Sequence, residues 1–234
     1  ECPLFCLIGK SQMTTLTLVV RNGHYFVNID GNLWLIDTGA TSSFGETPNL
    51  SICGETFELA SNYLGLTAKT LSEMVGDNCV GLIGTNILSR FDLIFDTIDG
   101  NFIISKDELS HTGQSVFLNQ FKGIPIVSAH ISGTEYQMFL DTGAQLSYFQ
   151  NNSIREFPAS GIVNDFYPGF GEFQTETHEV PITLGGIDFM IRCGTLPGLL
   201  GMKLMIENVQ GVIGNAIFAN RIVGYFPRQC RMVL

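Results

Sequence analysis

Two stretches of the chain carry a pattern of apolar and turn-forming residues that predicts a β-hairpin. Each stretch has an extended apolar run, a short turn containing Gly, Asn or Ser, and a second apolar run. The paired runs lie at residues 25–30 and 33–36, and again at residues 126–131 and 136–140. Each second run ends directly before an aspartate, Asp37 or Asp141.

The two predicted hairpins belong to a longer internal repeat. Asp-Thr-Gly-Ala follows the second apolar run both times, at residues 37–40 and 141–144. Further along, an apolar-apolar-Gly turn also occurs twice, at residues 82–84 and 212–214, and each is followed by a helix-compatible segment and a closing strand. One short match arises easily by chance, whereas two in the same order and context indicate a duplication.

The repeat predicts an all-β fold with two pseudo-symmetric, β-barrel-like lobes. Charged residues make up only 15% of the 234 residues, and Gly (26) and Phe (18) are abundant, which suits short strands and tight turns. The most polar stretch of the chain predicts the boundary between the two lobes. We expect an N-terminal lobe at residues 1–104, a linker at 105–115 and a C-terminal lobe at 116–234.

Charge and hydropathy exclude several partners. The net charge of −10 argues against nucleic acid and anionic membrane surfaces. No apolar run approaches the roughly 18–20 residues of a membrane span. The four histidines show no zinc-binding spacing, so we expect neither a metal site nor a cofactor.

Six cysteines leave the pairing and the compartment open. They are Cys2, Cys6, Cys53, Cys79, Cys193 and Cys230. A cross-link between the N-terminal cysteines and Cys230 would suit an exported protein, and free buried thiols fit the sequence equally well. The chain begins at Glu1, which is compatible with a removed leader, and we lean to a secreted or periplasmic location.

The two aspartates suggest a specific chemistry. If the repeated turns meet across the pseudo-symmetry axis, Asp37 and Asp141 come too close for both to ionise, and they share a proton. One carboxyl then acts as general base on a water while the other acts as general acid toward a carbonyl oxygen. Thr38 and Thr142 would hydrogen-bond across the axis. Two further residues of the motifs, Gly39 and Gly143, would let the backbone approach the carboxyls.

On these motifs, the chain resembles the aspartic proteases of the pepsin and retropepsin group. The matched features extend from about residue 14 to the end of the chain. The resemblance implies the two-lobed acid protease fold with the active-site cleft between the lobes. It also implies that Asp37 and Asp141 are the catalytic dyad and that Thr38 and Thr142 form the grip between the lobes.

The residue after each Asp-Thr-Gly is similar to that of retroviral-type proteases. Pepsin-like chains carry Ser or Thr there, whereas this chain has Ala40 and Ala144. Retroviral-type enzymes are homodimers of one lobe, but both aspartates lie on one polypeptide here, so we expect a monomer. Without a hydroxyl beside the carboxyls, we expect an activity maximum in the mildly acidic range.

The lobes differ in one insert. Asp141 follows Asp37 by 104 residues, but Gly214 follows Gly84 by 130, so the second lobe holds 26 extra residues. The insert has a Gly-rich aromatic centre that resembles the retropepsin flap. Its candidate flap and substrate-binding residues are Tyr167, Gly169, Phe170 and Gly171. An ordinary surface hairpin is the alternative.

The leading functional hypothesis is therefore an aspartic endopeptidase. Its partner would be an extended polypeptide substrate with apolar residues at the scissile bond, because an extended chain can pair with strand edges around the site. A catalytically silent, peptide-binding or inhibitor-like protein of the same fold is the alternative, and a self-processing regulator is a third possibility. No Gly-x-Ser-x-Gly motif supports serine chemistry.

Overall fold

The protein is mostly β-structure, which confirms the all-β prediction. The computed structural model describes residues 13–150, 152–201 and 208–234. Strands account for 53% and helices for 13%. In the described part of the chain, no helix is long and apolar enough to cross a membrane.

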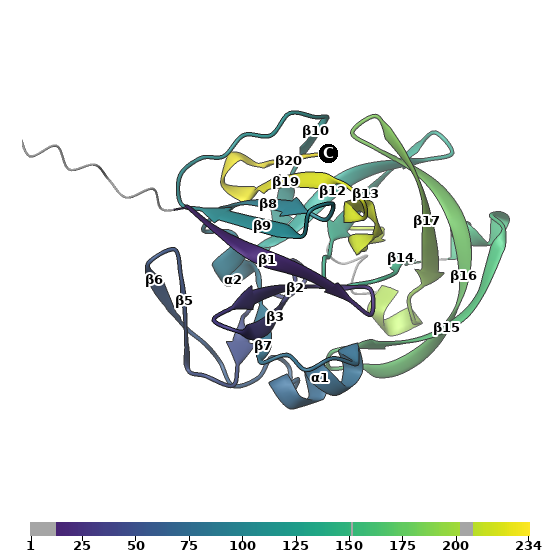
Figure 1. Ribbon diagram of the computed structural model, residues 1–234. Coiled ribbons are helices and arrows are strands. Elements are labelled where there is room, and N and C mark those ends of the chain that lie inside the picture. Colours follow the sequence, from purple (N-terminus) through teal and green to yellow (C-terminus); the bar gives the residue numbers. More distant parts are fainter. Residues whose placement is uncertain (1–12, 151, 202–207) are drawn as a thin grey trace, which may run out of the picture.

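Most strands belong to two large sheets (Figure 1). The larger sheet has the order β10-β20-β19-β8-β9-β1-β2-β3-β7-β4. Its strands are β1 (Met13–Arg21), β2 (His24–Ile29), β3 (Asn32–Ile36), β4 (Phe44–Gly45), β7 (Gly81–Ile83), β8 (Asp92–Asp96), β9 (Asn101–Ser105), β10 (Ser115–Phe117), β19 (Ile222–Phe226) and β20 (Arg231–Val233).

The second large sheet has the order β11-β12-β13-β18-β14-β17-β16-β15, and β12 also pairs with the end of β16. Its strands are β11 (Asn119–Phe121), β12 (Ile124–Ile131), β13 (Thr134–Leu140), β14 (Ser147–Phe149), β15 (Ala159–Tyr167), β16 (Gly171–Leu184), β17 (Ile187–Thr195) and β18 (Gly211–Ile213).

The remaining elements are short. A separate hairpin consists of β5 (Asn49–Ile52) and β6 (Glu55–Glu58). The helices are α1 (Ala68–Val75), α2 (Thr85–Leu88) and the 3-10 turns η1 (Asn152–Glu156), η2 (Asn215–Phe218) and η3 (Pro227–Gln229). Helix α1 was not predicted from the sequence, although the capping box between Thr67 and Thr70 and the left-handed Gly76 at its end are recognisable signals.

Both hairpins that lead to the repeated aspartates are present. β2 pairs with β3 and β12 pairs with β13, each antiparallel. Asp30 and Gly31 in the first turn, and Ser132 and Gly133 in the second, have positive φ angles. Two consecutive positive φ angles match the twist of the flanking strands. The local sequence pattern therefore predicted these elements correctly.

The halves of the chain are interleaved in the larger sheet. β19 and β20 return from the C-terminal half and join the sheet through β8, with Ile222 opposite Asp96. β10 pairs with β20 at the edge. The predicted linker at residues 105–115 joins β9 to β10, two strands of the larger sheet. The division into two sheets therefore does not coincide with the predicted lobe boundary, which stays a prediction.

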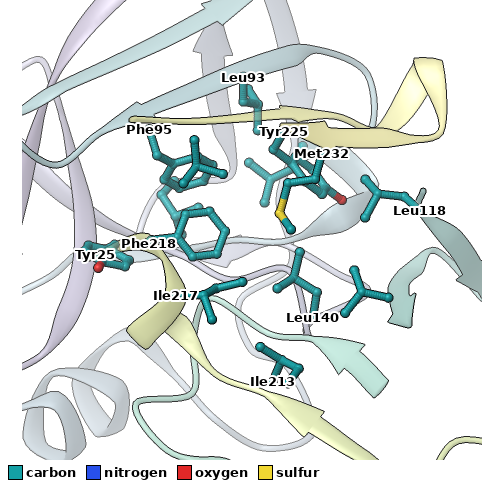
Figure 2. Close-up of a cluster of buried hydrophobic side chains, with 14 of the residues drawn as sticks. Tyr25, Leu93, Phe95, Leu118, Leu140, Ile213, Ile217, Phe218, Tyr225 and Met232 are labelled. Carbon is teal, nitrogen blue, oxygen red and sulfur yellow. The ribbon is translucent and has the colours of Figure 1, made fainter. Parts of the chain in front are cut away.

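A single large hydrophobic cluster spans both halves (Figure 2). Phe95 contacts Phe102 and Phe218, with ring centroids 4.9 Å and 5.0 Å apart. Leu140, which directly precedes the second aspartate, and Ile36, which precedes the first, are both fully buried in this cluster. The apolar strands that end at the aspartates are therefore held by the core, which makes their ends rigid.

The cysteines in the described residues are all free thiols: Cys53, Cys79, Cys193 and Cys230. Cys2 and Cys6, for which a cross-link to Cys230 was one expectation, lie outside the described residues.

Candidate active site

The first Asp-Thr-Gly-Ala turn begins where β3 ends. β3 runs parallel to β7, and the Asp37 backbone N–H donates to the Ile83 carbonyl at 3.1 Å. The Asp37 side chain then caps its own turn, because Oδ1 accepts from the N–H groups of Gly39 and Ala40 at 2.8 Å and 2.9 Å. Aspartate favours such turns since its short carboxyl reaches the backbone two residues on.

The second turn repeats this arrangement at the end of β13. β13 runs parallel to β18, and the Asp141 N–H donates to the Ile213 carbonyl at 2.9 Å. Asp141 Oδ1 accepts from the N–H groups of Gly143 and Ala144 at 2.9 Å and 3.2 Å. The sequence repeat is therefore a structural repeat at hydrogen-bond level.

The apolar-apolar-Gly turns support both sites in the same way. The Gly84 N–H donates to the Ser43 hydroxyl at 2.8 Å, and the Gly214 N–H donates to the Ser147 hydroxyl at 3.0 Å. The carbonyls of the two motif alanines also accept equivalent bonds, each at 2.8 Å. These bonds come from the N–H of Thr85 to Ala40 and from the N–H of Asn215 to Ala144.

The two turns are locked together by their threonines. The Thr38 hydroxyl donates to the Leu140 carbonyl at 2.7 Å and accepts from the Thr142 N–H at 3.0 Å. The Thr142 hydroxyl makes the reciprocal bonds, to the Ile36 carbonyl at 2.8 Å and from the Thr38 N–H at 3.1 Å. Both threonines are fully buried, so these four bonds are shielded from water.

The glycines bring each turn against the opposite carboxyl. A Cβ added at Gly39 would lie within 2.7 Å of Asp141 Oδ1, and one added at Gly143 would lie 2.6 Å from Asp37 Cγ. Neither position has room for a side chain. The structure therefore brings Asp37 and Asp141 together, with their carboxyls facing each other across the pair of turns.

The carboxyl pair favours retention of a proton. Burial, the charge of Asp141 and the hydrogen bond between the two carboxyls raise the pKa of Asp37 well above its ordinary value. Burial also raises the pKa of Asp141, although hydrogen bonds from Asp37, Gly143 and Ala144 oppose it. Since the groups titrate together, the shared proton belongs to the pair.

The four predicted flap residues lie at the turn end of the β15–β16 hairpin, which curves along the right side of the molecule in Figure 1. The Phe170 N–H donates to the Tyr167 carbonyl at 3.0 Å, and Gly169 and Gly171 have φ angles of +79° and +102°. Glycine adopts these angles without strain. Tyr167 packs on the apolar cluster of the second sheet, whereas Phe170 is 40% exposed.

The turn of this hairpin reaches the N-terminal half of the chain. A Cβ at Gly169 would lie 3.9 Å from Leu64 Cβ. The neighbouring Tyr63 hydroxyl lies 3.4 Å from the Thr41 hydroxyl, one residue beyond the first motif. The first-half hairpin β5–β6 instead places Cys53 against Ile104 at 3.4 Å. That the β15–β16 hairpin acts as a flap stays a prediction.

Four polar residues near the two turns were not predicted from the sequence: His24, Gln145, Tyr148 and Asp165. His24 at the start of β2 lies 2.5 Å from the Gln145 amide, and Gln145 also donates to the Asn22 carbonyl at 2.6 Å. Burial lowers the pKa of His24, partly offset by the Gly143 carbonyl and the charge of Asp165. Tyr148 donates a hydrogen bond to Asp165. Asp165 lies in the predicted insert of the second lobe, so its position could have identified it as a candidate site residue. No local sequence feature identified His24.

No group of three or more His, Cys, Asp or Glu side chains in the described part of the chain is arranged to hold a metal ion. A hollow of about 210 Å³ lined by Arg155, Glu176 and His178 includes neither aspartate of the pair, and we assign it no role in the chemistry.

Neither protein-family models nor curated protein sequences match this chain.

Proposed function

We propose that the chain is an aspartic endopeptidase, similar in its site to the pepsin and retropepsin group and acting as a monomer with both aspartates on one chain. The single observation that supports this most is the facing pair of Asp37 and Asp141. Four hydrogen bonds of Thr38 and Thr142 hold the pair, and it favours keeping one proton. The proposal includes two pseudo-symmetric lobes of the acid protease fold, with the substrate bound between them.

The proposed first step is the attack of water on the peptide carbonyl. The ionised carboxyl of the pair takes a proton from the water as the oxygen bonds to the carbonyl carbon. The protonated carboxyl gives its proton to the carbonyl oxygen, so that a neutral tetrahedral diol forms. The pair as a whole still holds one proton, because one carboxyl gained what the other lost.

In the second step the diol collapses. One carboxyl donates its proton to the amide nitrogen as the carbon–nitrogen bond breaks, and the other accepts a proton from a diol hydroxyl. The products are a carboxylic acid and an amine, and the pair returns to its singly protonated state. A raised proton affinity suits this cycle, since one carboxyl must be protonated at each step.

We propose that the substrate is an extended polypeptide with apolar residues beside the scissile bond. Apolar side chains accompany both turns: Leu66 belongs to the same apolar cluster as Ala40 of the first motif, and Leu146 and Tyr148 follow Ala144 of the second motif by two and four residues. An extended chain between them can pair with the β15–β16 hairpin as an added strand.

The test is cleavage of an unfolded, apolar-rich protein between pH 3 and 7, with and without a statine-type transition-state mimic. We predict cleavage that the mimic inhibits, and the loss of at least about a thousandfold in kcat/KM in Asp37→Asn and in Asp141→Asn. Each variant should lose nearly as much as the double variant, because the two carboxyls act as a unit.

Asp99→Asn is the matched control, since Asp99 is an exposed carboxyl remote in sequence from both motifs. It should cleave like the wild type. Near-normal turnover in either dyad variant would exclude the mechanism. Binding of the mimic without any cleavage would instead favour the catalytically silent, peptide-binding alternative.

A further inference from the structure

The β1–β2 turn of the first half lies against the second Asp-Thr-Gly-Ala turn. Asn22 and Gly23 form this turn, with φ angles of +48° and +76°, between the paired residues Arg21 and His24. An Asn-Gly pair suits this conformation, because both residues adopt positive φ angles at little cost. A Cβ added at Gly23 would lie 3.1 Å from Cδ of Gln145, which directly follows the second motif. The two halves of the chain therefore meet here as well as at the threonines.

Asn215 joins this turn to the second motif. Its side-chain Nδ2 donates to the Gly23 carbonyl at 2.8 Å and to the Thr142 carbonyl at 3.2 Å. Its backbone N–H donates to the Ala144 carbonyl at 2.8 Å. The residue is buried, which strengthens these bonds because water does not compete for them. Asn215 thus binds the carbonyls on both sides of Gly143 and connects them to the first half.

Gln145 makes a second connection to the same turn. Its Nε2 donates to the Asn22 carbonyl at 2.6 Å and lies 2.5 Å from His24 Nε2. An amide nitrogen donates and does not accept, so His24 accepts here through the unprotonated nitrogen of a neutral ring. Burial lowers the pKa of His24, which favours the same neutral form. The turn is therefore bonded to the second half through Asn22, Gly23 and His24 in succession.

The corresponding contact on the other side of the repeat is built differently. In the β11–β12 turn, Lys122 and Gly123 have φ angles of +51° and +86°. A Cβ added at Gly123 would lie 3.4 Å from Oγ1 of Thr85, the residue that corresponds to Asn215. The Thr85 hydroxyl donates to the Ala40 carbonyl of its own half at 3.2 Å. The approach of the turn is thus repeated, whereas the donor of Asn215 crosses between the halves and that of Thr85 stays within one.

We propose that Asn215 and Gln145 are positioning residues for Asp141: through their bonds to the β1–β2 turn, they fix the second motif against the first half. The N–H groups of Gly143 and Ala144 donate to Asp141 Oδ1 at 2.9 Å and 3.2 Å, so a shift of this turn moves the carboxyl. The inference rests on the proposed function, in which a misplaced carboxyl slows the chemical step.

The first test variant is Asn215→Thr, which takes the residue that the first half has at this position. A hydroxyl there can bond to the Ala144 carbonyl as the Thr85 hydroxyl bonds to its own motif. The backbone N–H of residue 215 is unchanged. The variant therefore removes the amide that reaches Gly23 while it keeps the support within the second half.

The measurement is amide hydrogen exchange by NMR on the whole protein without substrate. The exchange rate at Gly143 and Ala144 is divided by the rate at Gly39 and Ala40, the equivalent amides of the first motif. A general loss of stability accelerates exchange in both turns, so it leaves this ratio unchanged. We expect Asn215→Thr to raise the ratio about threefold or more, because it loosens the second turn alone.

Gln145→Met is the second variant, and Asn22→Gly is the matched control. Gln145 is exposed, so Gln145→Met leaves the core intact, and we expect it to raise the ratio in the same direction. Asn22→Gly removes the side chain that donates to the Val75 and Gly76 carbonyls at the end of α1, at 3.1 Å and 2.9 Å. It keeps the backbone carbonyl that accepts from Gln145, and it should leave the ratio unchanged.

Activity gives the second readout. Asn215→Thr should lower kcat about tenfold and leave KM within about twofold of the wild type, because the variant displaces a reacting group. An unchanged exchange ratio in both variants, an equal rise in Asn22→Gly, or a raised ratio with unchanged kcat would overturn the inference. Absence of cleavage by the wild type would contradict the proposed function alone, because the exchange ratio needs no activity.

Discussion

The Asp-Thr-Gly-Ala motifs divide three physical tasks among their residues. Asp37 Oδ1 accepts two backbone N–H groups of its own turn, and Asp141 Oδ1 does the same in the second turn. The backbone therefore fixes one oxygen of each carboxyl within its own turn. The threonines join the turns, and the glycines leave the space into which the opposite carboxyl fits. The motifs therefore fix the position of each carboxyl against the other.

The retained proton makes stability depend on pH in a predictable direction. An aspartate has a pKa near 3.9 in the unfolded chain, and the folded site raises the pKa of Asp37 well above that. The folded state therefore binds the proton more tightly. Its contribution to stability is fully present below pH 4 and is lost as the pH rises through the folded pKa, because the buried pair must then ionise.

Asp37→Asn removes this titration while keeping a side chain of the same shape. We predict that Asp37→Asn unfolds with about the same free energy as the wild type near pH 4 and is more stable at pH 7. The expected gain is about 1.4 kcal/mol for each unit by which folding raises the pKa. Urea unfolding at several pH values checks this, with Asp99→Asn as control. Parallel stability profiles of the wild type and Asp37→Asn would contradict it.

At the scale of elements, the sequence predicted what depends on local pattern. Strand alternation and turn residues predicted the hairpins β2–β3 and β12–β13, and the difference in motif spacing predicted the β15–β16 hairpin. Contacts between elements distant in sequence carried no local signal. His24 approaches Gln145 only because the β1–β2 turn meets the second motif, and β19 reaches β8 only through sheet assembly.

The β15–β16 hairpin offers a matched comparison of two turn glycines. Gly171 ends its turn with a φ of +102°, and Gly186, in the β16–β17 turn, has a φ of +82°. A Cβ at either position would meet no atom within 4 Å, so Ala substitution adds only backbone strain, about 1–2 kcal/mol in each case.

We predict that Gly171→Ala and Gly186→Ala lower thermal stability by similar amounts but differ in activity. If the β15–β16 hairpin opens and closes over substrate, Gly171→Ala should lower kcat/KM about tenfold or more, because the turn loses conformations that the movement needs. Gly186→Ala should leave kcat/KM within about twofold of the wild type. Equal kcat/KM values in both variants would favour the ordinary surface hairpin.

At the scale of the whole molecule, the halves of the repeat are not independent units. The larger sheet contains strands from both halves, and one hydrophobic cluster joins Phe95 and Phe102 to Phe218 and Tyr225. The fully buried Asp92 adds a polar connection, since its carboxyl accepts from the Arg228 guanidinium at 3.1 Å and from the Leu109 N–H at 2.9 Å. Because the two halves share one sheet and one hydrophobic cluster, we expect them to unfold together.

We therefore predict a single cooperative unfolding transition, and the chain carries probes in each half. Trp34, the only tryptophan, is buried in β3, and Cys193 is fully buried in β17. Trp34 fluorescence and the labelling of Cys193 by a thiol reagent should change at the same urea concentration, because neither half keeps a complete core without the other. Cys79, buried beside α1, is the labelling control for the first half. Exposure of Cys193 well before Trp34 would show that the C-terminal half opens alone.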